Sequence, residues 1–224
     1  MEIVSQVGRV VLLTSADEFT TGGRSFVDLS KAIADRCGFA KFPKTLEEWQ
    51  APNGAEFLFG RWDGIEIPKL VIYARGVSLD TKFSTDESDR ILGEMLGWAA
   101  ETLKVGYRSR PIHRRLYQSE IVFISDMSLN ATNPVLSLAS DILSRSVSEQ
   151  WKQMFSYEVV GLSVGIDESN VKFSPGLFRL ERRQSVPFGD KAYYSLAPVQ
   201  TEQHKVLLQQ IETALMSRDG TAKP

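Results

Sequence analysis

The residues best suited to binding chemistry form a basic segment near the middle of the chain. Residues 104–115 carry five lysine or arginine side chains and no acidic one, and Tyr107 and Tyr117 flank the run. Arginine forks match phosphate and carboxylate groups, and tyrosine rings stack on bases. One interpretation is therefore a site for an anionic ligand, such as a nucleotide or single-stranded nucleic acid. Its residues would be Arg108, Arg110, His113, Arg114 and Arg115.

The helix predicted just before this segment offers the arginines a different role. Residues 84–103 carry five acidic residues against the single Arg90. A basic helix end pairs readily with an acidic face beside it or with a partner subunit, and we favour this second interpretation. A second basic group precedes residues 186–189, and contact between the two groups would strengthen the anion hypothesis. This second group consists of Arg179, Arg182 and Arg183.

One sequence motif is compatible with a serine nucleophile. Residues 161–165 match the bare G-x-S-x-G pattern around Ser163, and His204 lies downstream. A nucleophile elbow needs a sharp turn from a strand into a helix. The surrounding residues instead predict an alternating strand that is followed by another strand. No catalytic residue is therefore assigned, and a hydrolase that uses Ser163 is only a third hypothesis.

Potential metal ligands are scattered along the chain. His113 and His204 lie far apart, and neither has the second histidine or the cysteines that a zinc site requires. Residues 22–25 contain two glycines but lack the lysine and the glycine spacing of a phosphate loop. Five acids lie near predicted strand ends and give the hydrolase hypothesis an alternative, carboxylate basis. They are Asp63, Glu66, Asp80, Asp126 and Asp167. No metal and no cofactor is expected.

Cysteine usage and charge limit the classes of protein further. The single cysteine, Cys37, cannot form an internal disulfide, and its place after an apolar helical stretch predicts a small buried thiol. A formal charge of -2 gives no global attraction to nucleic acid or an anionic membrane. No leader segment or membrane-spanning run is recognised. We expect a cytoplasmic protein that does not bind membranes.

The elements that would position these residues have clear signals in the first half. Branched residues predict a strand over 3–13, and a helix over 27–36 should end at Gly38. Asp63 and Gly64 between apolar runs predict a hairpin within a three-stranded meander over 55–83. A helix over 85–104 should start with a capping box formed by Ser84 and Glu87.

The second half continues with alternating strands and helices. The pattern predicts strands over 120–125, 157–166 and 171–182, and helices over 134–155 and 201–216. Thr201 is the expected N-cap of the last helix. Residues 178–194 should form an aromatic, irregular connection. This order predicts an α+β fold with a mixed, largely antiparallel sheet packed against about three to four helices around a single core. One domain would span 1–216, and 217–224 would be a flexible tail.

These features favour recognition over chemistry. The chain has no complete catalytic constellation, but its arginine-bearing and aromatic connections are typical of contact surfaces. The first hypothesis is therefore a non-catalytic interaction or assembly module of a cytoplasmic multi-protein system, with a protein partner or a second copy of itself. An anion-binding protein and a hydrolase are the alternatives.

Overall fold

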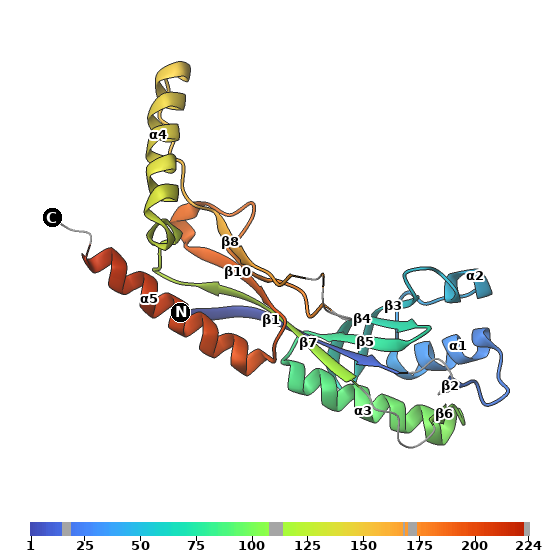
Figure 1. The fold of residues 1–224 in the computed structure, drawn as a ribbon. Coiled ribbons are helices and arrows are strands. Elements are labelled where there is room, and N and C mark those ends of the chain that lie inside the picture. Colours follow the sequence, from blue (N-terminus) through green and yellow to red (C-terminus); the bar gives the residue numbers. More distant parts are fainter. Residues whose placement is uncertain (15–18, 108–113, 168, 170–173, 222–224) are drawn as a thin grey trace. The chain divides into compact units, whose positions relative to one another are not determined.

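The computed structural model describes residues 1–14, 19–107, 114–167, 169 and 174–221. Its main sheet is antiparallel, with the strand order β3-β4-β5-β1-β7-β10-β9-β8 (Figure 1). Those strands are β1 (Glu2–Leu13), β3 (Ala55–Trp62), β4 (Ile65–Tyr73), β5 (Gly76–Thr81), β7 (Arg114–Ile124), β8 (Gly161–Val164), β9 (Phe178–Arg182) and β10 (Ala192–Ala197). A small separate sheet pairs β2 (Phe19–Thr20) with β6 (Gly106–Tyr107).

In the described part of the chain, four long helices and one short one accompany the sheet, which confirms the predicted α+β class and single core. They are α1 (Phe26–Cys37), α2 (Leu46–Trp49), α3 (Thr85–Thr102), α4 (Pro134–Trp151) and α5 (Thr201–Thr221), with two 3-10 turns, η2 (Leu129–Thr132) and η4 (Phe188–Asp190). Internal contacts divide the chain into two units, which we describe separately. The α3 unit comprises residues 6–120 and 198–202, and the α4 unit comprises residues 1–5, 121–197 and 203–224.

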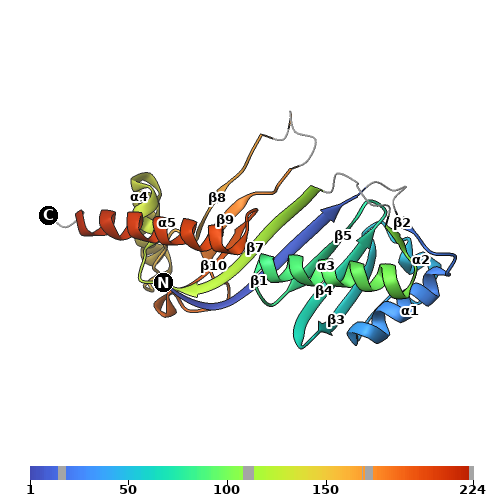
Figure 2. The same cartoon turned by 90° about the horizontal axis from the view of Figure 1, so that it is seen from below.

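The predicted meander forms the floor of the α3 unit. Trp62 pairs with Ile65 across the expected turn, where Asp63 and Gly64 adopt φ values of 47° and 86°. Leu70 of β4 lies opposite Leu79 of β5, and both side chains are buried. Helix α3 lies along the strands of this unit (Figure 2). The hairpin signal therefore placed three strands correctly.

The helix boundaries of the α3 unit agree with the capping signals in part. Gly38 ends α1 in the left-handed region, with φ 63°, as predicted. Ser84 accepts the backbone N–H of Glu87 at the start of α3. The Glu87 side chain does not complete the predicted box, because its carboxylate pairs with Arg90 at 2.5 Å.

The α4 unit has its own group of buried apolar side chains. Phe123 of β7 stacks on Tyr193 of β10 with ring centroids 5.5 Å apart, and both rings are fully buried. Leu208 of α5 belongs to the same group. The prediction of an irregular connection over 178–194 was wrong in part: β9 lies within the strand predicted over 171–182, but β10, which pairs with β9 and places Tyr193 opposite Arg182, was missed. Buried and half-buried residues alternate along β10, as is typical of a strand. The prediction was based on the aromatic and proline content of this segment and overlooked that alternation.

Candidate interaction surface

Arg115 of the basic segment contacts the acidic helix. Arg108, Arg110 and His113 lie outside the described residues, whereas Arg114 and Arg115 begin β7. The Arg115 Nε lies 2.8 Å from Asp89 Oδ1 of α3. Tyr117 donates its hydroxyl to Asp89 Oδ2 at 3.2 Å, and burial together with this carboxylate raises the pKa of Tyr117. Arg115 thus joins β7 to α3.

The second basic group belongs to the α4 unit, and its central member has a structural role. Arg182 Nη2 lies 2.9 Å from Glu158 Oε2, and the guanidinium carbon stands 4.7 Å from the centroid of the Tyr193 ring. Arg179 and Arg183 are exposed. The Arg182 charge is already paired with Glu158 and stacked on Tyr193. This group is therefore a weaker candidate for binding an anion than its sequence suggested.

The serine and histidine candidates lie in different environments. Ser163 is exposed within β8, opposite Arg179, and is not at a strand-to-helix turn. His204 is fully buried on α5, and its Nε2 lies 2.9 Å from the Oγ of the equally buried Ser195. Ser195 Oγ also donates to the Arg179 carbonyl at 2.8 Å. With both members enclosed, this pair ties α5 to β9 and β10.

The five predicted carboxylates do not converge. Asp80 is held by Arg9 through two hydrogen bonds of 2.6 Å each, and it is the only one of the five that is buried. Lys191 pairs with Asp126 and lowers the pKa of that carboxyl. The others pair with Arg36 (Asp63), with Arg61 and Lys82 (Glu66) and with Ser169 (Asp167). Within the described ranges, no three His, Cys, Asp or Glu side chains form a group that could hold a metal ion.

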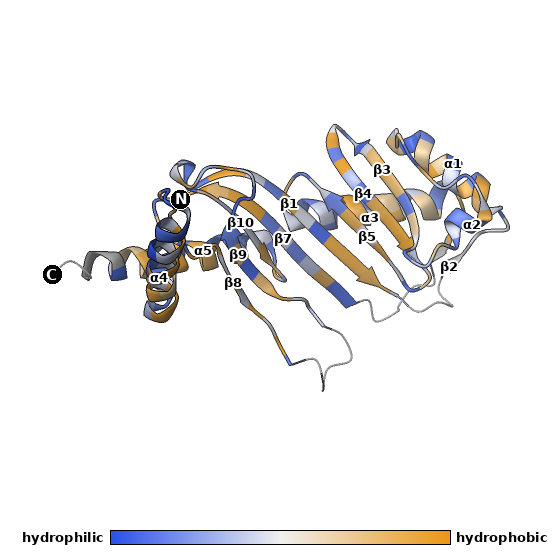
Figure 3. Ribbon diagram, turned by 90° about the horizontal axis from the view of Figure 1, so that it is seen from above, coloured by the Kyte–Doolittle hydropathy of each residue, from blue (hydrophilic) through white to orange (hydrophobic). Residues whose placement is uncertain are grey.

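Helix α4 carries an exposed apolar surface. Val135, Leu138 and Ile142 follow helical spacing along one side, with exposed fractions of 71%, 55% and 47%. Leu136 and Leu143 are exposed beside them. At the end of the helix, Trp151 is 68% exposed. We call Val135, Leu136, Leu138, Ile142 and Leu143 the α4 apolar surface; hydrophobic residues along α4 are visible in Figure 3.

The polar side of the same helix is the one that contacts protein. Lys152 turns the chain with φ 51°, and the following residues run back along α4 (Figure 1). Ser144 Oγ accepts the backbone N–H of Tyr157 at 2.8 Å, and Ser148 Oγ accepts that of Phe155 at 2.9 Å. A surface helix ordinarily buries its apolar side and exposes its polar side. Helix α4 does the reverse.

This inversion leaves a group of apolar side chains on α4 exposed to solvent. Isolated exposed leucines are common, but a contiguous exposed apolar patch on a protein surface marks a site of interaction. Sequence reasoning found the helix but not this surface, since apolar periodicity alone predicts a buried side. The signal that was present is the row Ser137, Ser140, Ser144 and Ser148 on the opposite side.

No protein-family model matches the sequence, and no curated protein sequence matches it at a significant level. Over the described residues, the helices are not long and apolar enough for any of them to cross a membrane.

Proposed function

We propose that this protein is a non-catalytic assembly module of a cytoplasmic multi-protein system, and that its α4 apolar surface packs on the same surface of a second copy. The observation that carries this proposal is the inversion of α4, whose serine side is covered and whose apolar side is open. Covering those side chains gains about 25 cal/mol for each Å² of apolar area removed from water.

The charges along α4 suit an antiparallel pair of identical helices. A two-fold axis beside Leu143 would place Asp141 opposite Arg145 of the second copy, and each pair would occur twice by symmetry. Asp141 and Arg145 are both exposed. The pairing therefore joins opposite charges at the edge and apolar groups at the centre.

Small residues allow the two helices to approach. Ala139 and Ser146 lie seven positions apart on the apolar side of α4 and are both exposed. The helix has 18 residues and is about 27 Å long, so one helix pair gives an interface at the small end of the known range. Such an interface predicts a reversible dimer with a dissociation constant of roughly micromolar order.

Sedimentation equilibrium over micromolar to near-millimolar concentrations tests this proposal. Wild type should show a monomer–dimer equilibrium, and Leu138→Glu should remain monomeric, because a charge within the apolar interface must be desolvated. Val206→Glu is the matched control, since Val206 of α5 is 52% exposed and lies outside the α4 apolar surface. It should dimerise like wild type. A wild type that stays monomeric, or a Leu138→Glu variant that dimerises equally well, would contradict the proposal.

A further inference from the structure

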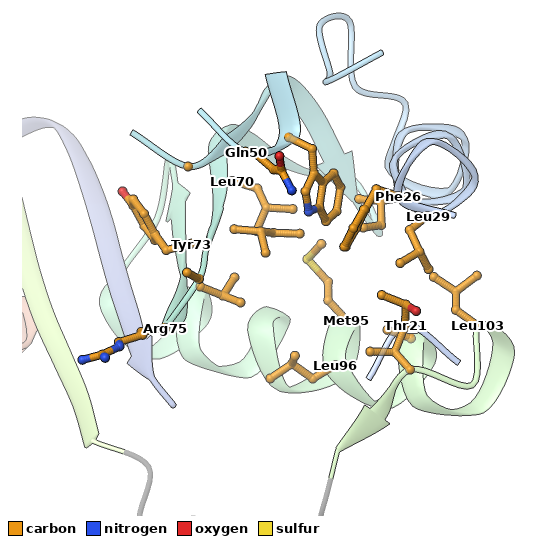
Figure 4. A pocket seen from close by; sticks show the side chains of 18 of the residues that line it. Thr21, Phe26, Leu29, Gln50, Leu70, Tyr73, Arg75, Met95, Leu96 and Leu103 are labelled. Atoms are coloured by element: carbon orange, nitrogen blue, oxygen red, sulfur yellow. The ribbon is translucent and has the colours of Figure 1, made fainter. Parts of the chain in front are cut away.

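A cavity of about 830 Å³ opens in the α3 unit, far larger than an ordinary packing defect. Helix α1, the end of α2, strands β4 and β5 and helix α3 supply its walls. Figure 4 shows Phe26, Leu29, Leu70, Met95 and Leu96 around the space. Its volume falls within the range of small-molecule binding sites.

The lining is nearly free of charge. Among the described residues that line the cavity, Arg75 is the single charged one, and its side chain points away from the space in Figure 4. Thr21 and Gln50 are neutral groups that can donate or accept a hydrogen bond. A charged ligand would lose its hydration here without gaining a partner, whereas a neutral apolar one would not.

The aromatic wall is held in place before any ligand arrives. Phe26 stacks on Trp49 with ring centroids 5.4 Å apart, and Trp49 meets Phe57 edge-on at 6.2 Å. Thr45 and Glu48 form a complete capping box that fixes α2. Both Phe26 and Trp49 remain half-buried, so their faces toward the cavity are open to a ligand.

A glycine brings the chain after α2 close against the sheet. Gly54 adopts φ 84°, and a Cβ there would stand 2.7 Å from Val71 Cγ1 and 2.8 Å from Tyr73 Cδ1. This left-handed conformation favours glycine, and the close approach leaves no room for a side chain. The rim of the cavity is thereby anchored to β4, which makes the site preformed.

We infer that this cavity binds a neutral, largely apolar small molecule, with Gln50 or Thr21 available for one hydrogen bond. Ligand sites of this kind combine an apolar lining with few polar groups. The inference is independent of the α4 apolar surface, because every lining residue belongs to the α3 unit. Binding should stabilise the folded chain by mass action.

A pair of dyes that share one aromatic scaffold tests the inference. Neutral N-phenylnaphthylamine should bind at one saturable site, and its sulfonated analogue, anilinonaphthalene sulfonate, should bind about tenfold more weakly or worse. The titrations use the wild-type protein, and the cavity-filling variant described below separates dye bound in the cavity from dye bound to the α4 apolar surface. Absence of saturable binding, or tighter binding of the sulfonate, would overturn the inference.

A variant that fills the cavity tests whether the dye binds there. Ala99 of α3 lines the space and is half-buried, so Ala99→Phe should weaken dye binding by at least about tenfold. Ala214→Phe on α5 is the control, because Ala214 is exposed and is not among the lining residues; it should leave binding unchanged. If thermal unfolding shows that Ala99→Phe does not fold, Leu96→Trp fills the same space. Unweakened binding to a folded filling variant would overturn the inference.

Discussion

Thr85 and Thr201 cap each other's backbone across 116 positions of sequence. The N–H of Thr85 donates to the Thr201 hydroxyl at 2.9 Å, and the N–H of Thr201 donates to the Thr85 hydroxyl at 2.9 Å. Both residues are fully buried. Because the first N–H groups of a helix have no partner within it, α3 and α5 each satisfy an otherwise unpaired donor of the other. Thr201 was predicted as an N-cap, but it is the first residue of α5.

Replacing Thr85 with valine should destabilise the fold. Thr85→Val keeps the shape of the side chain but leaves the buried N–H of Thr201 without its acceptor, at a cost of about 1–3 kcal/mol. Urea unfolding measures the change in the free energy of unfolding. Thr213→Val, on the exposed side of α5, should change it by less than about 0.5 kcal/mol. Equal effects of the two variants would mean that the reciprocal bonds contribute nothing.

A second prediction concerns the same helix start. A Cβ on Gly8 would lie 2.4 Å from the backbone of Ser84 and Thr85, so Gly8→Ala must displace α3 and should cost about 1–3 kcal/mol or more. Gly97→Ala is the comparison, since it lies inside α3 with open space around it. This change should stabilise the protein by about 0.5–1 kcal/mol. Thermal unfolding should therefore show a lowered melting temperature for Gly8→Ala and a raised one for Gly97→Ala. A stabilising Gly8→Ala would refute the packing argument.

Cys37 should react slowly with a disulfide reagent in the folded protein. The thiol is buried, and burial raises its pKa from 9.0 to about 11. The thiolate is the reactive form, so folded protein near pH 8 should react far more slowly than urea-unfolded chain. The raised pKa also means that the unfolded chain ionises first, and stability should therefore fall as pH rises from 9 through 11. A folded protein that reacts at the unfolded rate would show that Cys37 is accessible.

Exchanging charges on α4 tests whether the partner is a second copy. Asp141→Arg alone, or Arg145→Asp alone, would place like charges opposite each other twice, which should weaken the dimer by about tenfold. The double variant reverses both charges and should restore the wild-type affinity in sedimentation experiments at low salt. Weakening without restoration would instead indicate a different helix register or a different partner.

Local signals predicted much of this fold, because each depends on neighbouring residues. The Asp63-Gly64 turn, the Gly38 helix end and the Ser84 cap were all read from short spans and are present. The predictions that were wrong concerned residues whose contacts are distant in the sequence. Thr201 bonds to a residue on another helix, and Tyr193 is buried by Phe123 rather than by its neighbours in sequence.

The candidate surface was the harder part to foresee. Exposure of Val135 and Leu138 contradicts what apolar periodicity ordinarily implies, since the same spacing is typical of a buried side. Only the return of residues 155–157 along the serine side reveals which side is covered. The arginine-rich segment attracted attention by composition, yet at Arg115 the structure uses the charge to bind Asp89.

Cross-linking at the proposed two-fold axis tests the central claim most directly. A residue on that axis meets its own counterpart, so Leu143→Cys should form an intermolecular disulfide under mild oxidation at concentrations where the dimer is populated. The native Cys37 is buried and should not interfere. Val206→Cys on α5, with a similar exposed fraction, is the control. We predict rapid dimer formation for Leu143→Cys alone; no dimer, or equal dimer from Val206→Cys, would contradict the account.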